Sequence, residues 1–310
     1  MRNRTIYLCL HFTILFVSNL VAQIPDTSMT CGLEDLDTTA TTQYPRPDSS
    51  QLPYKVSTNH FVVHYATSGL DSFSLAGAQN VATMAESCWA RQIGRMDWLA
   101  PIPDGISGGD NRYDIYVEKL AVAGVTEHDY PTHRSYILLA NKFAGGSDRS
   151  NATLAHEFNH SSQWTYALFR EADRWIWEGT ADYMMKEVLP TPFAIGIYKG
   201  HASGMLFFPN KSLTQGTDDN AFFLQYLRER WNDTGLVRST WQRFKDNDGD
   251  FPLTVLGNEL FFRHAVTLDS ALAEYAIWRL FTNFRADSYH FQDASTGIVP
   301  FLVEFPAIVF

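Results

Sequence analysis

The spacing of apolar positions changes in character about half-way along the chain. In the first half, short runs of β-branched and aromatic residues bounded by polar residues predict strands over 60–65, 113–117 and 135–140. Apolar residues recur at helical spacing over 75–98, which predicts one long amphipathic helix. The stretch between the second and third strands contains Gly and His, and we expect a loop there.

From residue 151 onward the period is almost entirely helical. Helices are predicted over 151–168, 176–188, 219–231, 236–245 and 268–281, with Phe223, Tyr226, Tyr275 and Trp278 facing inward. Strands first and helices afterwards, without alternation, predict an α+β fold. We expect a β-rich lobe with a mixed sheet over 54–168, ending in a helix, and a mainly helical lobe over 169–310.

The N-terminus has the layout of a secretory signal peptide, with two Arg, an apolar run from Ile6 to Val21 and then Ala22. We expect cleavage after Ala22, which removes residues 1–22 and makes the product secreted. The run is short and interrupted by polar residues, so an uncleaved membrane anchor is the less favoured alternative. Residues 23–53 are rich in Thr, Ser, Asp and Pro, and we expect a linker with no core.

Cysteine content and charge narrow the class of protein. With Cys9 in the signal segment, Cys31 and Cys88 remain as a pair in an oxidising compartment. They form a disulfide, or Cys88 is a buried apolar residue of its helix; both alternatives stay open. A net charge of -10 without a basic cluster argues against nucleic acid or an anionic membrane as the main partner. Whether a further domain follows the apolar segment 301–310 stays open.

The candidate chemistry is concentrated in His156-Glu157-Phe158-Asn159-His160. On a helix, two histidines four residues apart project from the same face and reach one metal ion. Glu157 lies at the margin of that face, where its carboxylate can contact a zinc-bound water without being a ligand. Zinc lowers the pKa of such a water to about 7, and Glu157 would accept its proton as general base.

A second segment, residues 175–183, offers the third ligand. Glu178 supplies a carboxylate, and Asp182, four residues later, can accept the other N–H of a ligating histidine. Two His and one Glu leave a fourth position for water, as in catalytic rather than structural zinc sites. The alternative is that these residues are ordinary surface or hydrogen-bonded core residues.

Together, the His-Glu-x-x-His segment and Glu178-Gly179-Thr180-Ala181-Asp182 resemble the gluzincin zinc metallopeptidases, the thermolysin-like and aminopeptidase-like group, and in particular secreted bacterial gluzincin-like proteins. The resemblance covers 60–284 best. The seventeen residues between His160 and Glu178 are slightly fewer than is usual in that group. The metzincin pattern fails because Gln163 and Tyr166 occupy its Gly and third His positions.

The resemblance implies a zincin-like fold and a zinc site made of His156, His160 and Glu178. Glu157 would be the catalytic base, and Asp182 would accept a hydrogen bond from a ligating histidine. The substrate-amine motif Gly-x-Met-Glu-Asn of the aminopeptidase branch is absent from the sequence, which favours an endopeptidase acting on protein or peptide. The alternatives are a catalytically inactive gluzincin-like protein that binds a partner or surface, and a zinc hydrolase of a non-peptide amide.

Two further features of the family stay open for this chain. The resemblance implies that residues 135–141 form the sheet-edge strand along the cleft, where an extended substrate would pair with it; an ordinary core or edge strand is the alternative. Gluzincins also take a Tyr or His from the helical half to stabilise the oxyanion. The candidates are Tyr198, His201, Tyr226 and His264, and the sequence does not choose among them.

Overall fold

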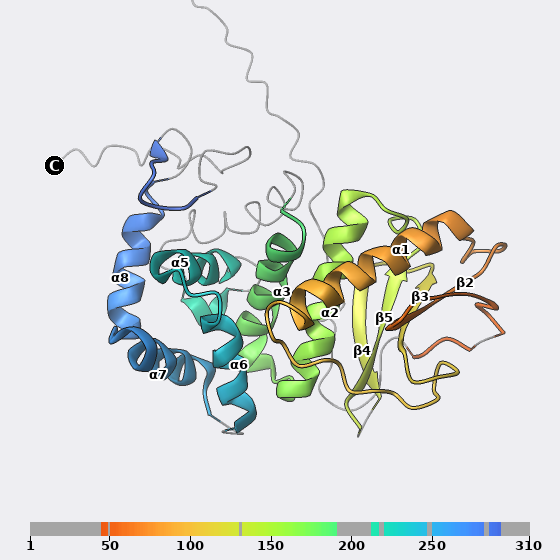
Figure 1. Cartoon of the computed structure of the whole chain (residues 1–310), viewed down its shortest axis with the longest axis horizontal. Coiled ribbons are helices and arrows are strands. Elements are labelled where there is room, and N and C mark those ends of the chain that lie inside the picture. The colour runs from red at the N-terminus through yellow and green to blue at the C-terminus, as the bar shows by residue number, and fades with distance from the viewer. Residues whose placement is uncertain are drawn as a thin grey trace, which may run out of the picture.

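The computed structural model describes residues 45–48, 50–129, 132–190, 212–216, 220–246, 250–281 and 285–292 (Figure 1). Within these ranges the fold is α+β, with one five-stranded sheet and seven α-helices. The expected signal segment 1–22, Cys31 and the oxyanion candidates Tyr198 and His201 lie outside the described residues. None of the helices in the described ranges is long and apolar enough to cross a membrane.

The sheet has the strand order β1-β2-β3-β5-β4. Its strands are β1 (Tyr54–Ser57), β2 (Phe61–Tyr65), β3 (Tyr113–Glu118), β4 (Gly124–Asp129) and β5 (Arg134–Ala140). The two outer pairs are antiparallel, and the inner pairs β2·β3 and β3·β5 are parallel. The three predicted strands are confirmed as β2, β3 and β5, whereas β1 and β4 were not predicted.

The expectation that 135–141 forms the edge strand is wrong. β5 lies between β3 and β4, and β4 is the edge. The segment between β3 and β5 was expected to be a loop, but part of it forms β4. This strand pairs with β5 antiparallel, from Gly124↔Leu139 to Asp129↔Arg134, and so covers the outer side of β5.

Helix α1 (Leu75–Cys88) continues as a π-helical turn, Trp89–Ile93, so the predicted long helix ends earlier than residue 98. Ser74 caps its N-terminus by accepting from the Gly77 N–H. The buried face of α1 packs with β2, β3 and β5 into one apolar cluster. Cys88 lies in this cluster as a fully buried free thiol.

The expectation of no core in 23–53 is wrong for the end of that range. Leu52 is buried against apolar residues of β3, β4 and β5. The Arg46 guanidinium lies among three carboxylates, 2.9 Å from Asp104, 2.7 Å from Asp114 and 3.1 Å from Asp129. These carboxylates attract the cation, and so fasten the segment before β1 to this face of the sheet.

The remaining helices are α2 (Asp148–Tyr166), α3 (Arg174–Val188), α5 (Ala221–Trp231), α6 (Leu236–Asp246), α7 (Pro252–His264) and α8 (Leu268–Trp278). Helices α2 and α3 lie between the sheet and helices α5–α8 (Figure 1). The predicted inward position of the four aromatic residues is confirmed, since Phe223, Tyr226, Tyr275 and Trp278 are all buried. Among the α-helices of the described ranges, only α7 was not predicted.

Candidate metal centre

Helix α2 is buried along almost its whole length, between the sheet on one side and α3 on the other. Ser147 caps its N-terminus by accepting a hydrogen bond from the Ser150 N–H. The negative charge of Asp148 in the first turn interacts favourably with the positive end of the helix dipole. The four-residue spacing puts His156 and His160 on one side of α2, where they meet Glu178 of α3. Two packed helices therefore position the three predicted ligands.

The side chains of His156, His160 and Glu178 converge on one point. The two Nε2 atoms are 3.0 Å apart, and Glu178 Oε2 lies 3.3 Å from Nε2 of His156 and 3.6 Å from Nε2 of His160. The exposed fractions are 3%, 0% and 1%. No other group of at least three His, Cys, Asp or Glu residues in the described part of the chain is arranged in this way.

The tautomer of each imidazole follows from the partner of its other nitrogen. His156 Nδ1 lies 2.8 Å from Asp182 Oδ1, and His160 Nδ1 lies 2.6 Å from Gln163 Oε1. The Gln163 amide orientation is fixed because its Nε2 donates to the Trp177 carbonyl at 3.0 Å. Both partners are acceptors, so both Nδ1 atoms carry the proton and both Nε2 lone pairs face Glu178.

Gln163 is one of the residues of this site that the sequence interpretation missed. In the sequence it stands out only as the wrong residue for a metzincin. The signal was present in the sequence, because a side chain three residues after His160 on a helix lies next to it. An amide there can orient the ring, and the second hydrogen bond of this amide reaches the backbone directly before Glu178.

The donor set fits zinc. Tetrahedral coordination with bonds of about 2.0–2.2 Å separates ligand atoms by roughly 3.3 Å, close to the three separations of 3.0, 3.3 and 3.6 Å. Both carboxylate oxygens of Glu178 are buried without a hydrogen bond in the described structure. Three converging acceptors fit a bound cation.

Glu157 lies on the side of α2 that faces the edge strand. Its carboxylate accepts a hydrogen bond from Thr126 Oγ1 at 2.9 Å, and its backbone oxygen lies 2.7 Å from the same hydroxyl. At Gly124 a Cβ would lie 3.0 Å from Glu157 Cγ and 2.7 Å from Thr153 Cγ2. Strand β4 therefore both makes room for the Glu157 side chain and orients it.

The two oxyanion candidates that the structure describes have other partners. The Tyr226 hydroxyl donates to Glu274 at 3.3 Å within the helical half, and His264 Nε2 lies 2.9 Å from Asp233 Oδ2. Neither contacts a ligand side chain, so the structure does not bring them to the metal centre.

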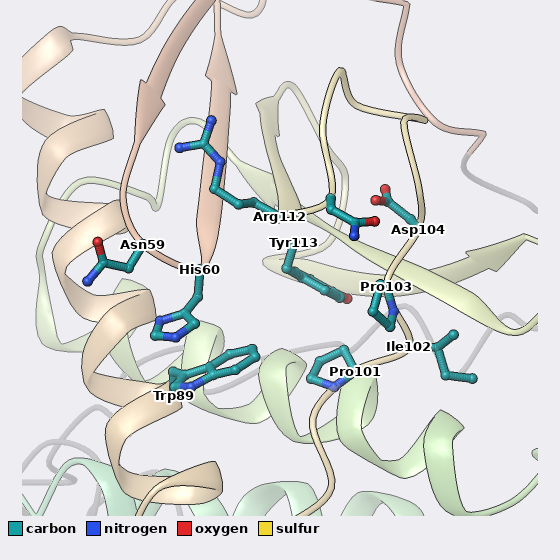
Figure 2. A pocket seen from close by; sticks show the side chains of 10 residues that line it. Asn59, His60, Trp89, Pro101, Ile102, Pro103, Asp104, Arg112 and Tyr113 are labelled. Atoms are coloured by element: carbon teal, nitrogen blue, oxygen red, sulfur yellow. The ribbon is translucent and has the colours of Figure 1, made fainter.

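A cavity of about 130 Å³ lies elsewhere, beside the stacked rings of His60 and Trp89 (Figure 2). Its lining includes Pro101, Arg112 and Tyr113 but none of the three ligands or Glu157. This cavity is therefore distinct from the metal centre.

Comparison with known proteins returns no relative: no protein-family model, no curated protein and no solved structure matches this chain.

Proposed function

We propose that this protein is a secreted, gluzincin-type zinc endopeptidase with a zincin-like fold, which hydrolyses peptide bonds with water activated at the metal. The observation that carries the proposal is the convergence of His156 Nε2, His160 Nε2 and Glu178 Oε2 in a buried site, with Glu157 next to His156 in the chain. Two His and one carboxylate are a ligand set that leaves a position open for water.

The chemistry divides among the metal and the residues of the chain. Bound zinc would act as a Lewis acid and lower the pKa of water to about 7. Glu157 would accept the proton of the attacking water and deliver it to the leaving amine. Thr126 holds the Glu157 carboxylate in place, while Asp182 and Gln163 fix the rings of the two histidines.

The edge of the sheet supports a peptide as the substrate. Strand β4 is an edge strand, and its Thr126 hydroxyl donates to the side chain of Glu157. An extended peptide paired with the outer edge of this strand would present its backbone beside the catalytic carboxylate. This role, which the resemblance assigned to 135–141, falls to β4 in the proposal.

The first test combines metal analysis with digestion of casein by the wild type and by Glu157→Gln. We expect one zinc per chain in both proteins and a loss of about 100- to 10,000-fold in kcat/KM for the variant, because only the general base is removed. The matched control is Glu86→Gln on α1, which contacts His60 far along the chain from the site and should leave activity unchanged. A chain without zinc would overturn the whole proposal.

A catalytically inactive gluzincin-like binding protein is the second candidate, and the near-complete burial of the three ligands favours it. Its expected result is one zinc per chain with no cleavage of casein by the wild type or by either variant. The third candidate, a hydrolase of non-peptide amides, would cleave a small acyl-amide substrate and leave casein intact, with the same dependence on Glu157.

A further inference from the structure

The face of β4 turned towards α2 continues beyond the catalytic carboxylate. Alternate residues of a strand share a face, so Gly124, Thr126 and His128 point the same way. Thr126 donates to the Glu157 carboxylate, and a Cβ added at Gly124 would lie 3.0 Å from Glu157 Cγ. The ring of His128 stacks on Trp164 of α2 at a centroid distance of 3.9 Å. Strand and helix therefore run side by side, from Glu157 to the C-terminal part of α2 (Figure 1).

At that end, the rings of His128, His133 and Trp164 form a cluster of nearly parallel planes, which we call the His-Trp cluster. His133 lies 5.8 Å from His128 and 6.2 Å from Trp164, with interplanar angles of 18° and 11°. Trp164 follows His160 by one helical turn and contacts Trp177 at 5.1 Å, and Trp177 in turn stacks on His160 at 6.3 Å. Ring contacts thus connect the cluster to the metal centre.

The cluster is accessible and its rings are held by stacking. Trp164 is 6% exposed and forms the back, while both imidazoles are partly exposed. Nδ1 of His128, Nδ1 of His133 and Nε1 of Trp164 are buried without a hydrogen-bond partner among the described residues. Within the described residues, stacking rather than a hydrogen bond at Nδ1 therefore holds the two imidazole rings.

His128, the member of the cluster that lies on β4, is also uncharged. Burial, together with the neighbouring His133, lowers the pKa of His128 to about 4, while Asp129 acts in the opposite direction. His128 is therefore neutral at neutral pH. An uncharged ring face suits an uncharged planar group better than an anion.

We propose that the His-Trp cluster is a substrate subsite that selects an uncharged aromatic side chain of the peptide. The inference rests on the proposed peptidase function. Thr126 and His128 are two positions apart in the strand, a distance of roughly 7 Å along its axis. A peptide that pairs with β4 and reacts beside Glu157 consequently brings a side chain close to the cleaved bond onto the cluster.

The test uses peptides that differ at one position near the cleaved bond, with Phe, Leu or Asp there. For the wild type we expect kcat/KM to favour Phe over Leu by about three- to tenfold, the range of measured ring-pair contributions, with Asp slowest. His128→Ala and His133→Ala should bring the Phe-to-Leu ratio close to one, whatever their effect on overall turnover. His128→Phe keeps a stacking ring and should keep the preference.

The matched control is His60→Ala, a histidine that also stacks on a tryptophan but borders the separate cavity. It should leave the ratio unchanged. Zinc content and melting temperature confirm that each variant is folded. An unchanged Phe-to-Leu ratio in folded His128→Ala and His133→Ala would overturn the subsite.

Binding separates a failure of this inference from a failure of the proposed function. Titration calorimetry of the same peptides on zinc-loaded Glu157→Gln measures recognition without turnover. If the Phe peptide binds more tightly and His128→Ala removes the difference, the subsite stands even where the wild type cleaves nothing. If the wild type cleaves all the uncharged peptides equally and binding shows no preference, the peptidase stands and the subsite is wrong.

Discussion

The two histidines of the proposed metal centre are anchored by chemically different partners. His156 donates to the carboxylate of Asp182, whereas His160 donates to the neutral amide of Gln163. A carboxylate raises the basicity of the ring that it orients, while an amide mainly fixes the ring position. Because the Gln163 amide also bonds to the Trp177 carbonyl, it joins His160 to the backbone that carries Glu178.

Replacing Gln163 should therefore weaken metal binding. We expect Gln163→Leu to lower zinc affinity about 10- to 100-fold, as loss of such a partner typically does, measured by competition with a chromophoric chelator. The control is Gln92→Leu, because Gln92 is equally buried and donates to Ala155 of α2 without touching a ligand. It should lower the melting temperature and leave zinc affinity unchanged. Equal affinities in all three proteins would remove Gln163 from the site.

At the scale of elements, the strands and helices that could be predicted are those whose own residues show a clear pattern of apolar positions. Strands β2, β3 and β5 are dense in β-branched and aromatic residues because they are buried, so the pattern finds them. Strand β4 carries Gly124, Thr126, His128 and Asp129, and it is a strand because β5 pairs with it over its whole length. The local sequence of β4 therefore does not reveal that this segment pairs with β5.

The same distinction holds within the site. Helical spacing alone brings His156 and His160 onto one face, and the Glu178 segment was found by its carboxylates four residues apart. Gln163 and Thr126 act through groups that are distant in sequence, a carbonyl of α3 and a carboxylate of α2. Helix α7 was missed because exposed Phe261 and Phe262 obscure its apolar period.

Strand β4 provides a prediction at this scale. In Gly124→Ala the new methyl would meet Thr153 Cγ2 at 2.7 Å and Glu157 Cγ at 3.0 Å, so the strand or the catalytic side chain must shift. We expect kcat to fall at least tenfold with zinc content unchanged, since a small displacement of a catalytic group is costly. The control is Gly257→Ala in α7, where the nearest atom is Leu268 Cβ at 3.5 Å.

Gly257→Ala should instead raise the melting temperature, because Ala is favoured over Gly in a helix by about 1 kcal/mol. Full activity in a folded Gly124→Ala protein would show that β4 does not set the position of Glu157.

At the scale of the whole molecule, the buried acidic group around Arg46 makes stability depend on pH. Burial and the adjacent Asp114 raise the pKa of Asp104 to about 7 from its ordinary value of 3.8, although Arg46 opposes them. Between these two values the native chain binds a proton that the unfolded chain does not. The contribution of Asp104 to the free energy of unfolding therefore falls as pH rises from 4 to 7.

Asp104→Asn should remove this dependence, since the amide stays neutral. We expect its melting temperature, compared with that of the wild type, to rise by a few degrees between pH 5 and pH 8. Differential scanning calorimetry at four pH values measures this difference. A constant difference across the range would mean that Asp104 keeps an ordinary pKa in the folded protein.

The proposed metal centre would also join the two halves of the molecule, because His156 and His160 lie on α2, which packs on the sheet, and Glu178 lies on α3, which packs on α5. A ligand present at 1,000 times its Kd stabilises the folded state by about 4 kcal/mol. We therefore expect chelation to lower the melting temperature by about 10 °C, and added zinc to restore it.

Glu178→Gln retains the shape of the side chain but removes the charge that attracts the cation, so its melting temperature should respond much less to chelator. If wild type and variant respond alike, the stabilising metal is bound at a place other than His156, His160 and Glu178.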